Sequence, residues 1–403
     1  MRSSSLIIRG LATVSPLGSS ADEVSESLRR AQPAPGEIGG SPVFRVTASG
    51  ERVLEQLAKN KRYASLDRAT LLALAAAKQT IATLPEGSPS IGCVSIGSAR
   101  GATTSLEKSV LGHACAEAPL APDTSPNTTA GNISSWVAQA VAESRGPQKP
   151  IASLGTSMTC TSALHSLLIA KAFIDSGMAD SALFGGAEAC LTPYTLAQLS
   201  ALRIYTREKG VYPCMPCLSA PARTNSVTLG EGSGTAILQR RDESPDGSSP
   251  FCPGDMQLLG IGWSLEAAVS ATGISEDGDG LEAAMRQALS ELPPGRKVDA
   301  VVLHAPGTAK GDAAELSAVA RLLGDVPVCS SKHLTGHTYG ASGMLSLCMA
   351  QWLLNGGGWA GFPYPSVASS RPFEAPSTVL INAAGFGGNS ISMAVGLPDG
   401  HNA

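Results

Sequence analysis

The sequence has little of what marks a protein that binds nucleic acid or spans a membrane. Only 15% of its residues are charged, and its 29 Lys and Arg against 33 Asp and Glu give a formal net charge of −4 at pH 7. Phosphate-rich partners and anionic membrane surfaces require concentrated positive charge, so neither partner is predicted. No stretch reaches the roughly 18 consecutive apolar residues of a membrane-spanning helix, so no membrane partner is expected.

The cysteines and the N-terminus show no sign of a secreted, disulfide-bonded protein. The nine cysteines are odd in number and have no regular spacing, whereas disulfide frameworks use even numbers at regular spacings. The first ten residues lack the apolar run of a signal peptide. We therefore expect reduced thiols and a cytoplasmic location. Cys214 and Cys217 form a single C-x-x-C, which is weak support for a zinc site without a second pair, and no metal is predicted.

The chain is rich instead in small and apolar residues that repeat one pattern in each half. Of its 403 residues, 43% are hydrophobic. Periodicity predicts strands at 6–18, 91–97, 150–160, 179–188, 229–239, 256–264, 298–303, 326–331 and 378–396, the last being two strands about a glycine turn. Helices are predicted at 20–30, 65–84, 161–176, 196–202, 280–292, 312–323 and 341–354, with helical pieces within 102–146. Residues 31–50, 122–135 and 203–226 are expected to form loops.

This alternation predicts an internally duplicated α/β architecture. The expected halves are residues 1–240 and 255–403. Residues 240–254 have the charge, proline and glycine content of an exposed connector between them.

Cys160 lies at the most distinctive point of the first half, where a predicted short, buried strand gives way to a helix. From Thr161 onward, apolar residues recur every three or four positions until Gly177 ends the pattern. The amide groups and dipole at a helix N-terminus favour a thiolate, so we expect the thiol pKa to be lowered. Cys160 is thus a candidate nucleophile, although a cysteine taken at random is more often a buried structural thiol.

Two histidines and a glycine turn in the second half complete the candidate site. His304 follows an apolar strand, and His337 lies in a glycine-rich strand-to-helix turn analogous to that of Cys160. Residues 385–388, Gly-Phe-Gly-Gly, form a turn whose amides could contact an acyl oxygen. A lone histidine at a strand end is more often structural. A cysteine and two histidines at strand ends fit acyl transfer, in which a thiolate accepts the acyl group and imidazoles stabilise an enolate.

Four motifs in order carry a resemblance to a known family. They are T-C-T-S-A-L-H at 159–165 with G-G-A-E at 185–188, the run from His304 through Asp312 to Glu315, the run from Lys332 through His337 to Gly343, and G-F-G-G at 385–388. Residues 10–18 echo the family's opening motif. The sequence resembles the β-ketoacyl-[acyl-carrier-protein] synthases of the KAS I/II type, in the thiolase superfamily. The resemblance spans nearly the whole chain and implies a thiolase fold with α-β-α-β-α layers.

The resemblance also implies a role for each matching residue. Cys160 would accept the acyl group, with the amides of Cys160 and Phe386 forming its oxyanion hole and Phe386 lying at the gate between the acyl and malonyl sites. His304 and His337 would assist decarboxylation and stabilise the enolate. Supporting roles are implied for Lys332 as a catalytic-site charge near His304, for Thr308, Gly385 and Gly387 in binding phosphopantetheine, and for Asp312 and Glu315 behind the catalytic residues.

The implied activity is a decarboxylative Claisen condensation. An acyl thioester held on Cys160 would react with malonyl-carrier protein to give a 3-oxoacyl product, in fatty acid synthesis or in a specialised polyene or polyketide pathway. No cofactor of the chain's own is expected, because the acyl carrier protein brings the phosphopantetheine arm. We also expect a homodimer or a heterodimer with a related subunit, paired across a two-fold axis through the apolar strand at 179–185.

Three residues bear on how far the resemblance extends. Pro306 replaces the first threonine of a pair that usually binds pantetheine, and it offers neither a hydroxyl nor an N–H group. Ser346 replaces a glutamate, which changes the charge balance around Lys332. Both departures indicate a divergent member. His165 matches a family histidine, but its mid-helix position faces away from the nucleophile, so we interpret it as structural.

Three other functions fit these residues less well. A non-catalytic, chain-length-factor-like partner of another ketosynthase would generally lack the nucleophilic cysteine, which this chain has. A degradative thiolase needs a second cysteine in a C-terminal C-x-G context, where this chain has residues 385–388. Starter enzymes of the KAS III type use Cys-His-Asn, whereas His337 occupies the second-histidine position here. A catalytic condensing enzyme is therefore the leading hypothesis.

Overall fold

The computed structural model describes residues 5–145, 150–219, 224–241, 252–267, 273 and 275–397. Its main strands are β1 (Leu6–Val14), β4 (Ile91–Gly97), β5 (Ala152–Thr156), β6 (Ser181–Glu188), β8 (Gly232–Arg240), β9 (Met256–Leu265), β10 (Ala300–Val302), β11 (Val328–Cys329), β12 (Thr378–Gly385) and β13 (Asn389–Gly396). Its longer helices are α1 (Ala21–Arg30), α2 (Ala48–Ala58), α3 (Arg68–Ala82), α4 (Thr103–Ala116), α6 (Asn132–Arg145), α7 (Ser162–Asp175), α8 (Pro193–Ala201), α9 (Asp279–Ser290), α10 (Ala309–Leu323) and α12 (Ser342–Leu354).

The two halves of the chain build the sheet in the same way. The described strands form a ten-stranded sheet in the order β11-β10-β12-β13-β9-β1-β8-β6-β4-β5. Each half contributes five strands, which can be numbered along the chain within that half. Across the sheet they lie in the order third, second, fourth, fifth and first in both halves. The first two pairings are parallel and the next two antiparallel in both halves. The halves join where β1 pairs antiparallel with β9. The predicted internal duplication of an α/β fold is confirmed.

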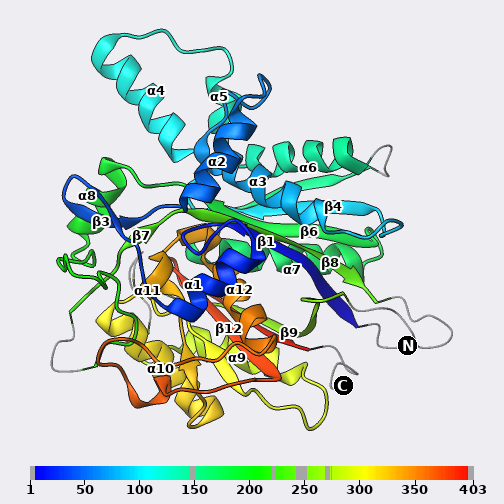
Figure 1. Ribbon diagram of the computed structural model, residues 1–403, viewed down its shortest axis with the longest axis vertical. Helices are drawn as coiled ribbons and strands as arrows, with labels where there is room; N and C mark the ends of the chain where they lie inside the picture. Colours follow the sequence, from blue (N-terminus) through cyan, green and yellow to red (C-terminus); the bar gives the residue numbers. More distant parts are fainter. Residues whose placement is uncertain are drawn as a thin grey trace.

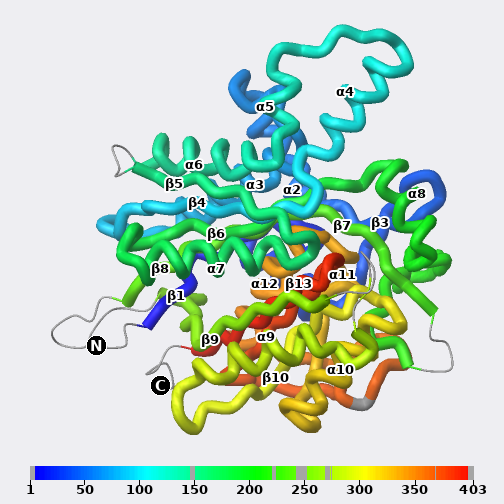
Figure 2. The backbone as a smooth tube through the Cα atoms, turned by 180° about the vertical axis from the view of Figure 1, so that it is seen from behind, coloured from blue at the N-terminus to red at the C-terminus, as the bar shows by residue number. Residues whose placement is uncertain are grey.

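Helices and half-sheets alternate in five layers (Figure 1). Helices α3 and α6 cover the outer face of the first half-sheet, and α9, with α10 packed on it, covers the outer face of the second. Between the half-sheets lie α7 and α12, which contact each other. The view from behind in Figure 2 shows the same stacking. The layering explains why α12 is buried on nearly all sides, since a helix between two sheets has no face left for solvent.

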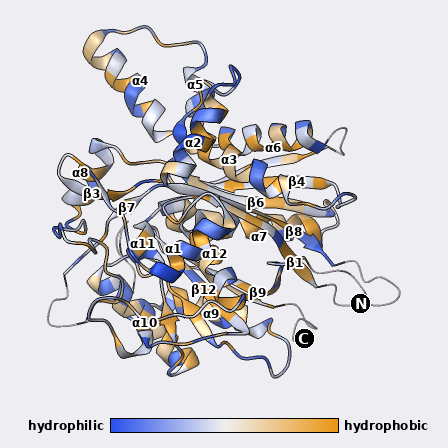
Figure 3. Cartoon of the chain, in the orientation of Figure 1, coloured by the Kyte–Doolittle hydropathy of each residue, from blue (hydrophilic) through white to orange (hydrophobic). Residues whose placement is uncertain are grey.

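The colouring by hydropathy agrees with this burial. In Figure 3 the strands and the helices packed on them carry most of the hydrophobic colour. The central core joins apolar residues of α7, such as Leu164 and Leu167, to residues of α12, such as Leu347 and Leu353. The two helices that begin at the candidate site are therefore anchored in the largest core.

Capping side chains explain several helix starts that the sequence predicted. Ser20 accepts a hydrogen bond from the Glu23 amide at the start of α1, and Asp67 accepts one from the Ala69 amide at the start of α3. Such N-cap bonds satisfy amides that have no partner within the helix. Both helices begin within three residues of the predicted position.

The prediction of a loop at 31–50 is wrong. Strands β2 (Gly36–Ile38) and β3 (Ser41–Phe44) form a hairpin there, followed by the start of α2. Strand β3 pairs in parallel with β7 (Leu229–Gly230), and Phe44 is only 1% exposed. A partner strand so distant in the sequence leaves no local periodic signal, which is why Pro and Gly content alone suggested a loop.

Two further expectations about local structure need correction. Residues 122–135 are not all loop, because they contain α5 (Thr124–Thr128) and the first turn of α6. The strand before Cys160 is not fully buried, because β5 lies at the edge of the sheet with alternate residues exposed. Most of the predicted connector at 240–254 lies outside the described residues. Among the described helices, none combines the length and apolarity needed to cross a membrane.

The expected pairing of the strand at 179–185 across a two-fold axis is also wrong. Strand β6 is an interior strand whose two edges are already hydrogen-bonded, in parallel to β4 and antiparallel to β8. All eight of its residues are buried. Its apolar composition reflects burial within the sheet.

Candidate active site

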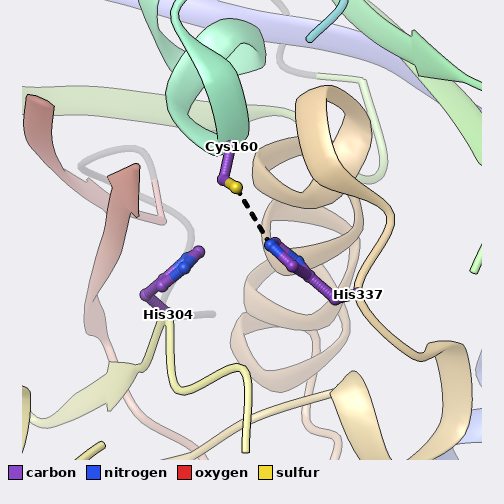
Figure 4. A group of neighbouring side chains, drawn as sticks. All are labelled: Cys160, His304 and His337. Atoms are coloured by element: carbon purple, nitrogen blue, oxygen red, sulfur yellow. Dashed lines mark hydrogen bonds between the residues drawn. The ribbon is translucent and has the colours of Figure 1, made fainter. Parts of the chain in front are cut away.

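Cys160, His304 and His337 come together from three separate segments of the chain. Cys160 lies in the short 3-10 turn η1 (Thr159–Thr161) before α7, His304 follows β10, and His337 precedes the turn η2 (Tyr339–Ala341) before α12. Figure 4 shows the three side chains facing a common point. His337 Nε2 lies 3.0 Å from Cys160 Sγ, and the two imidazole rings have centroids 5.3 Å apart at an angle of 82°. The structure thus brings together the predicted nucleophile and both predicted histidines.

The same three side chains form the one group of metal-ligand type found among the described residues. One ligand atom from each lies within 4.8 Å of the others. A Cys-His-His set suits Zn²⁺. The same geometry also suits a thiol nucleophile with two imidazole hydrogen-bond donors beside it.

The backbone around Cys160 adopts a strained turn. Thr159 has a φ of 50°, a conformation that non-glycine residues rarely adopt. The Ser162 hydroxyl fixes the turn by donating to the Thr159 carbonyl at 2.6 Å and accepting from the Met158 amide at 2.9 Å. A strand-to-helix turn of this kind presents its central side chain outward.

Gly385 allows the predicted oxyanion turn to approach Cys160. A Cβ atom at Gly385 would lie 2.1 Å from Thr159 Oγ1 and 3.3 Å from the Cys160 nitrogen. Only glycine fits there, so the chain leaving β12 passes directly beside the Cys160 amide. This proximity agrees with an oxyanion hole formed by the amides of Cys160 and Phe386, which stays a prediction.

A cavity of about 620 Å³ opens onto the three side chains. The predicted pantetheine-contacting residues Thr308 and Gly385 line it, as does Phe386. Gly387 does not belong to the lining and is exposed. Pro306 lines the cavity as well. The cavity wall therefore lacks the hydroxyl that a threonine at this position would supply. Apolar lining comes from Leu199, Leu202, Ile204, Val227, Leu281, Ala309, Ala313 and Ala384.

The expectation of a lowered thiol pKa is wrong for Cys160 in this closed environment. Burial raises its pKa to about 12, and the nearby charge of Lys332 opposes that rise. Removing water disfavours any charged form, and here this effect exceeds the attraction of the ammonium. The thiol is therefore protonated at neutral pH. Lys332 is itself only 2% exposed, and burial lowers its own pKa.

Both histidines are neutral near pH 7 for the same reason. Burial and the Lys332 charge lower the pKa of His337 to about 3, and burial, Lys332 and His337 lower the pKa of His304 well below its ordinary value. A neutral imidazole has one N–H group, so it can donate from only one nitrogen. The two rings also differ in their partners. His337 Nδ1 lies 3.0 Å from Ser342 Oγ, whereas the buried His304 Nδ1 has no protein partner.

The two predicted supporting carboxylates hold the backbone of His304 and of the loop that follows it. Glu315 accepts hydrogen bonds from the amides of His304 at 2.8 Å and Ala305 at 2.7 Å. Asp312 accepts from the amides of Cys217, Gly307 and Thr308. Burial raises the pKa of Asp312 to about 7 and also raises that of Glu315. The Lys332 charge opposes the rise in the pKa of Glu315.

Glu188 is a supporting residue whose role the sequence did not reveal. Its buried carboxylate accepts from the amides of Ala99 at 2.7 Å and Arg100 at 3.2 Å, and from the Gly340 amide at 3.1 Å. It thereby ties the loop after β4 to the turn η2 beside His337. Burial raises its pKa to about 7. The only signal was its place in the G-G-A-E motif.

The remaining cysteine and histidine predictions concern residues outside the site. His165 is buried in α7 with Nδ1 3.2 Å from the Thr161 carbonyl, and it does not line the cavity. Cys214 and Cys217 are both buried with free thiols. Cys217 contributes its backbone amide, rather than its sulfur, to the Asp312 carboxylate.

The chain matches the models of two known protein domains. Residues 4–244 match the model of the Beta-ketoacyl synthase, N-terminal domain, and residues 257–360 match that of the C-terminal domain. The chain belongs to the beta-ketoacyl synthase family. The resemblance seen in the sequence motifs is confirmed, and the protein is a divergent ketosynthase-family member of the thiolase superfamily.

Individual relatives are distant. The chain is 32% identical to 3-oxoacyl-[acyl-carrier-protein] synthase 2 of Vibrio harveyi over 231 residues, which cover 55% of this chain and 51% of that protein. The match thus spans about half the length of that relative. The fold is similar to the ishigamide ketosynthase/chain length factor, with a TM-score of 0.84, 20% identity and coverage of 98% and 99% of the two chains. The fold is also similar to that of a chain in a structure of a type II PKS acyl-carrier protein in complex with its ketosynthase bound to the hexaketide. The TM-score is 0.78, the identity is 20%, and the match covers 98% of this chain and 100% of that chain.

Proposed function

We propose that this ketosynthase-family chain is a β-ketoacyl-[acyl-carrier-protein] synthase that condenses an acyl group held on Cys160 with malonyl-carrier protein. The observation that carries the proposal is the 3.0 Å contact between Cys160 Sγ and His337 Nε2, with the His304 ring beside it and all three side chains lining the cavity. This constellation supplies one nucleophile and two imidazoles, as the two half-reactions require.

In the first half-reaction, Cys160 takes the acyl group from the carrier. Its sulfur attacks the thioester carbonyl carbon, the bond to the pantetheine sulfur breaks, and the thiol proton ends on the departing sulfur. Because the pKa of Cys160 is raised to about 12, thiolate formation at the moment of attack must be supported locally. The Lys332 charge and the N-terminal amides of α7 act in that direction, and the amides of Cys160 and Phe386 would bind the oxyanion.

In the second half-reaction, malonyl-carrier protein loses carbon dioxide. The electrons of the breaking bond develop as an enolate on the thioester oxygen, which His304 and His337 would stabilise with N–H groups from their Nε2 atoms. The enolate carbon then attacks the acyl carbonyl and releases the Cys160 sulfur, which takes up one proton from solvent. An N–H group without an acceptor is unfavourable when buried, so the unpartnered Nδ1 of His304 favours a proton on its Nε2 instead.

We further propose an acyl carrier protein and a second ketosynthase subunit as partners. Lys310 lines the cavity and is exposed, which suits the phosphate of an incoming pantetheine arm. Strand β5 leaves one edge of the sheet open, and α4 exposes Leu106, Val110 and Leu111. An open edge and exposed apolar residues are features that a subunit interface would cover. Sedimentation of a stable monomer at micromolar concentration would contradict this expectation.

The alternative is a non-catalytic partner that sets chain length in another ketosynthase. The similarity of the fold to the ishigamide ketosynthase/chain length factor is the observation that supports this alternative. Such a subunit would not need Cys160 in contact with a histidine, and it would not need Glu315 to hold the His304 backbone.

One experiment separates the two functions. The protein is incubated with acyl-carrier proteins of varied chain length, and the mass of the Cys160 peptide is measured before and after addition of malonyl-carrier protein. A condensing enzyme gains the acyl mass on Cys160 and then loses it as 3-oxoacyl product forms. A partner subunit gains no adduct at any chain length, and that result would overturn the proposed activity.

A further inference from the structure

We propose that Ser342 is a positioning residue for His337, donating its hydroxyl hydrogen to Nδ1 so that the imidazole proton stays on Nε2. The inference rests on the proposed function, because a proton on Nε2 matters only if that atom faces reacting groups. It concerns a residue between Ala341 and Gly343 to which the sequence motifs assign no role.

The geometry is a continuous chain of four side chains. Cys160 Sγ lies 3.0 Å from His337 Nε2, His337 Nδ1 lies 3.0 Å from Ser342 Oγ, and Ser342 Oγ lies 3.1 Å from Thr338 Oγ1. None of the four is more than 5% exposed. With solvent excluded, the direction of each hydrogen bond is set by the other groups in the chain.

The direction follows from what the second half-reaction needs. A developing enolate oxygen requires a donor, so Nε2 must carry the proton. A neutral ring then has a bare Nδ1, which must be offered a hydrogen by its neighbour. The Ser342 hydroxyl can make that donation while accepting the Thr338 hydroxyl hydrogen on its own oxygen. The opposite arrangement would place the proton on Nδ1 and leave Nε2 unable to donate.

Ser162 shows that this use of a serine is specific to the second turn. Ser162 and Ser342 each begin the helix that follows a 3-10 turn, and they have nearly the same backbone angles, with φ of −53° and −55°. The Ser162 hydroxyl bonds the backbone of its own turn, at Met158 and Thr159. At the same place in η2, the Ser342 hydroxyl instead faces the histidine.

The direct test is the tautomer of His337, read by solid-state NMR on protein labelled with ¹⁵N-histidine. The signals of His337 are assigned among the six histidines by their loss in His337→Gln. We expect protonated Nε2 and unprotonated Nδ1 in the wild type and in Ser342→Thr, which keeps the hydroxyl. In Ser342→Ala we expect a mixture of tautomers. Ser346→Ala makes the same change one turn further along α12 and is expected to keep the wild-type signals.

Carbon dioxide release from malonyl-carrier protein gives a second readout. Loss of one buried hydrogen bond should slow it about 10-fold in Ser342→Ala, with recovery in Ser342→Thr. A wild-type His337 protonated on Nδ1 would overturn the proposal, and so would an unchanged tautomer and rate in Ser342→Ala. The NMR result needs no activity. If wild-type protein keeps Nε2–H but releases no carbon dioxide, the proposed function fails while the role of Ser342 stands.

Discussion

The turn before α7 and the turn before α12 have the same shape but hold different side chains. Each is a three-residue 3-10 turn whose first residue has a positive φ, 50° at Thr159 and 42° at Tyr339. The second residue is Cys160 in one turn and Gly340 in the other. The two turns contact each other where the halves of the molecule meet.

The difference between the turns divides the chemistry. In the first turn the central position carries Cys160, the proposed nucleophile. In the second there is no room for a side chain, because a Cβ atom at Gly340 would lie 2.6 Å from the Ala99 nitrogen and 2.9 Å from Glu188 Oε2. The second turn instead contributes His337, just ahead of it, to the sulfur of the first. One repeat unit thus supplies the proposed nucleophile, and the other places an imidazole nitrogen 3.0 Å from its sulfur.

Replacing the nucleophile should have the largest effect. Cys160→Ala removes the sulfur from the first turn and should abolish the acyl adduct completely, because no other thiol lines the cavity among the described residues. Intact-protein mass spectrometry after incubation with acyl-carrier protein measures the adduct. An adduct of undiminished stoichiometry on the variant would mean that another residue carries the acyl group.

Filling the second turn should cost stability. Gly340→Ala forces a methyl group against Ala99 and Glu188, and overpacking of this kind typically destabilises by about 1–3 kcal/mol. Urea denaturation measures the free energy of unfolding. Gly210→Ala is the matched control, because a Cβ atom there meets nothing within 4 Å. Equal stability of the two variants would contradict the tight contact assigned to Gly340.

The wall of the cavity offers a smaller effect. Pro306→Thr restores a hydroxyl beside Thr308, and one hydrogen bond to the pantetheine arm corresponds to about a 2- to 10-fold lower KM for malonyl-carrier protein. Steady-state kinetics test this, with kcat expected to stay near the wild-type value. A higher KM, or no change, would show that the backbone already supplies another donor to the arm.

The smallest expected effect is that of pH on the histidines. Their pKa values are lowered, to about 3 for His337, so both rings should stay neutral and carbon dioxide release should show no histidine limb between pH 5 and 8. A group with a lowered pKa binds its proton only when the pH falls through that lower value. A fall in rate centred near pH 6.5 that disappears in His337→Gln would contradict the buried, neutral rings.

Much of this comparison could be read from the sequence. The parts that could not be read from it were missed for physical reasons. The Cys160 and His337 turns were recognisable because glycine and small residues mark strand-to-helix turns locally. The thiol pKa was predicted with the wrong sign, since burial depends on α12 and on a cavity formed by distant segments. The hairpin of β2 and β3 was missed because β7, nearly half the chain away, stabilises it.

The supporting contacts form a second group that sequence reasoning reached only in part. Asp312 and Glu315 were placed behind the histidines by resemblance. That their carboxylates accept hydrogen bonds from backbone amides could not be predicted, because it depends on which residues the fold brings close to them. Nothing in the sequence indicated the contact of Ser342 with His337. A serine at the start of a helix normally forms hydrogen bonds with nearby backbone groups, as Ser162 does. Strand β6 was misjudged as an interface because an apolar strand inside a sheet and one at an interface look alike in sequence.

The division of labour between the two turns is tested most directly by His337→Ala. The variant is incubated with acyl-carrier protein and then with ¹³C-labelled malonyl-carrier protein, and the Cys160 adduct and labelled carbon dioxide are measured in the same sample. The account predicts that the adduct still forms, while carbon dioxide release falls by about 10²- to 10³-fold, the usual cost of removing one preorganised donor. A His337→Ala protein that condenses at the wild-type rate would contradict it, because the second turn would then have no part in the reaction.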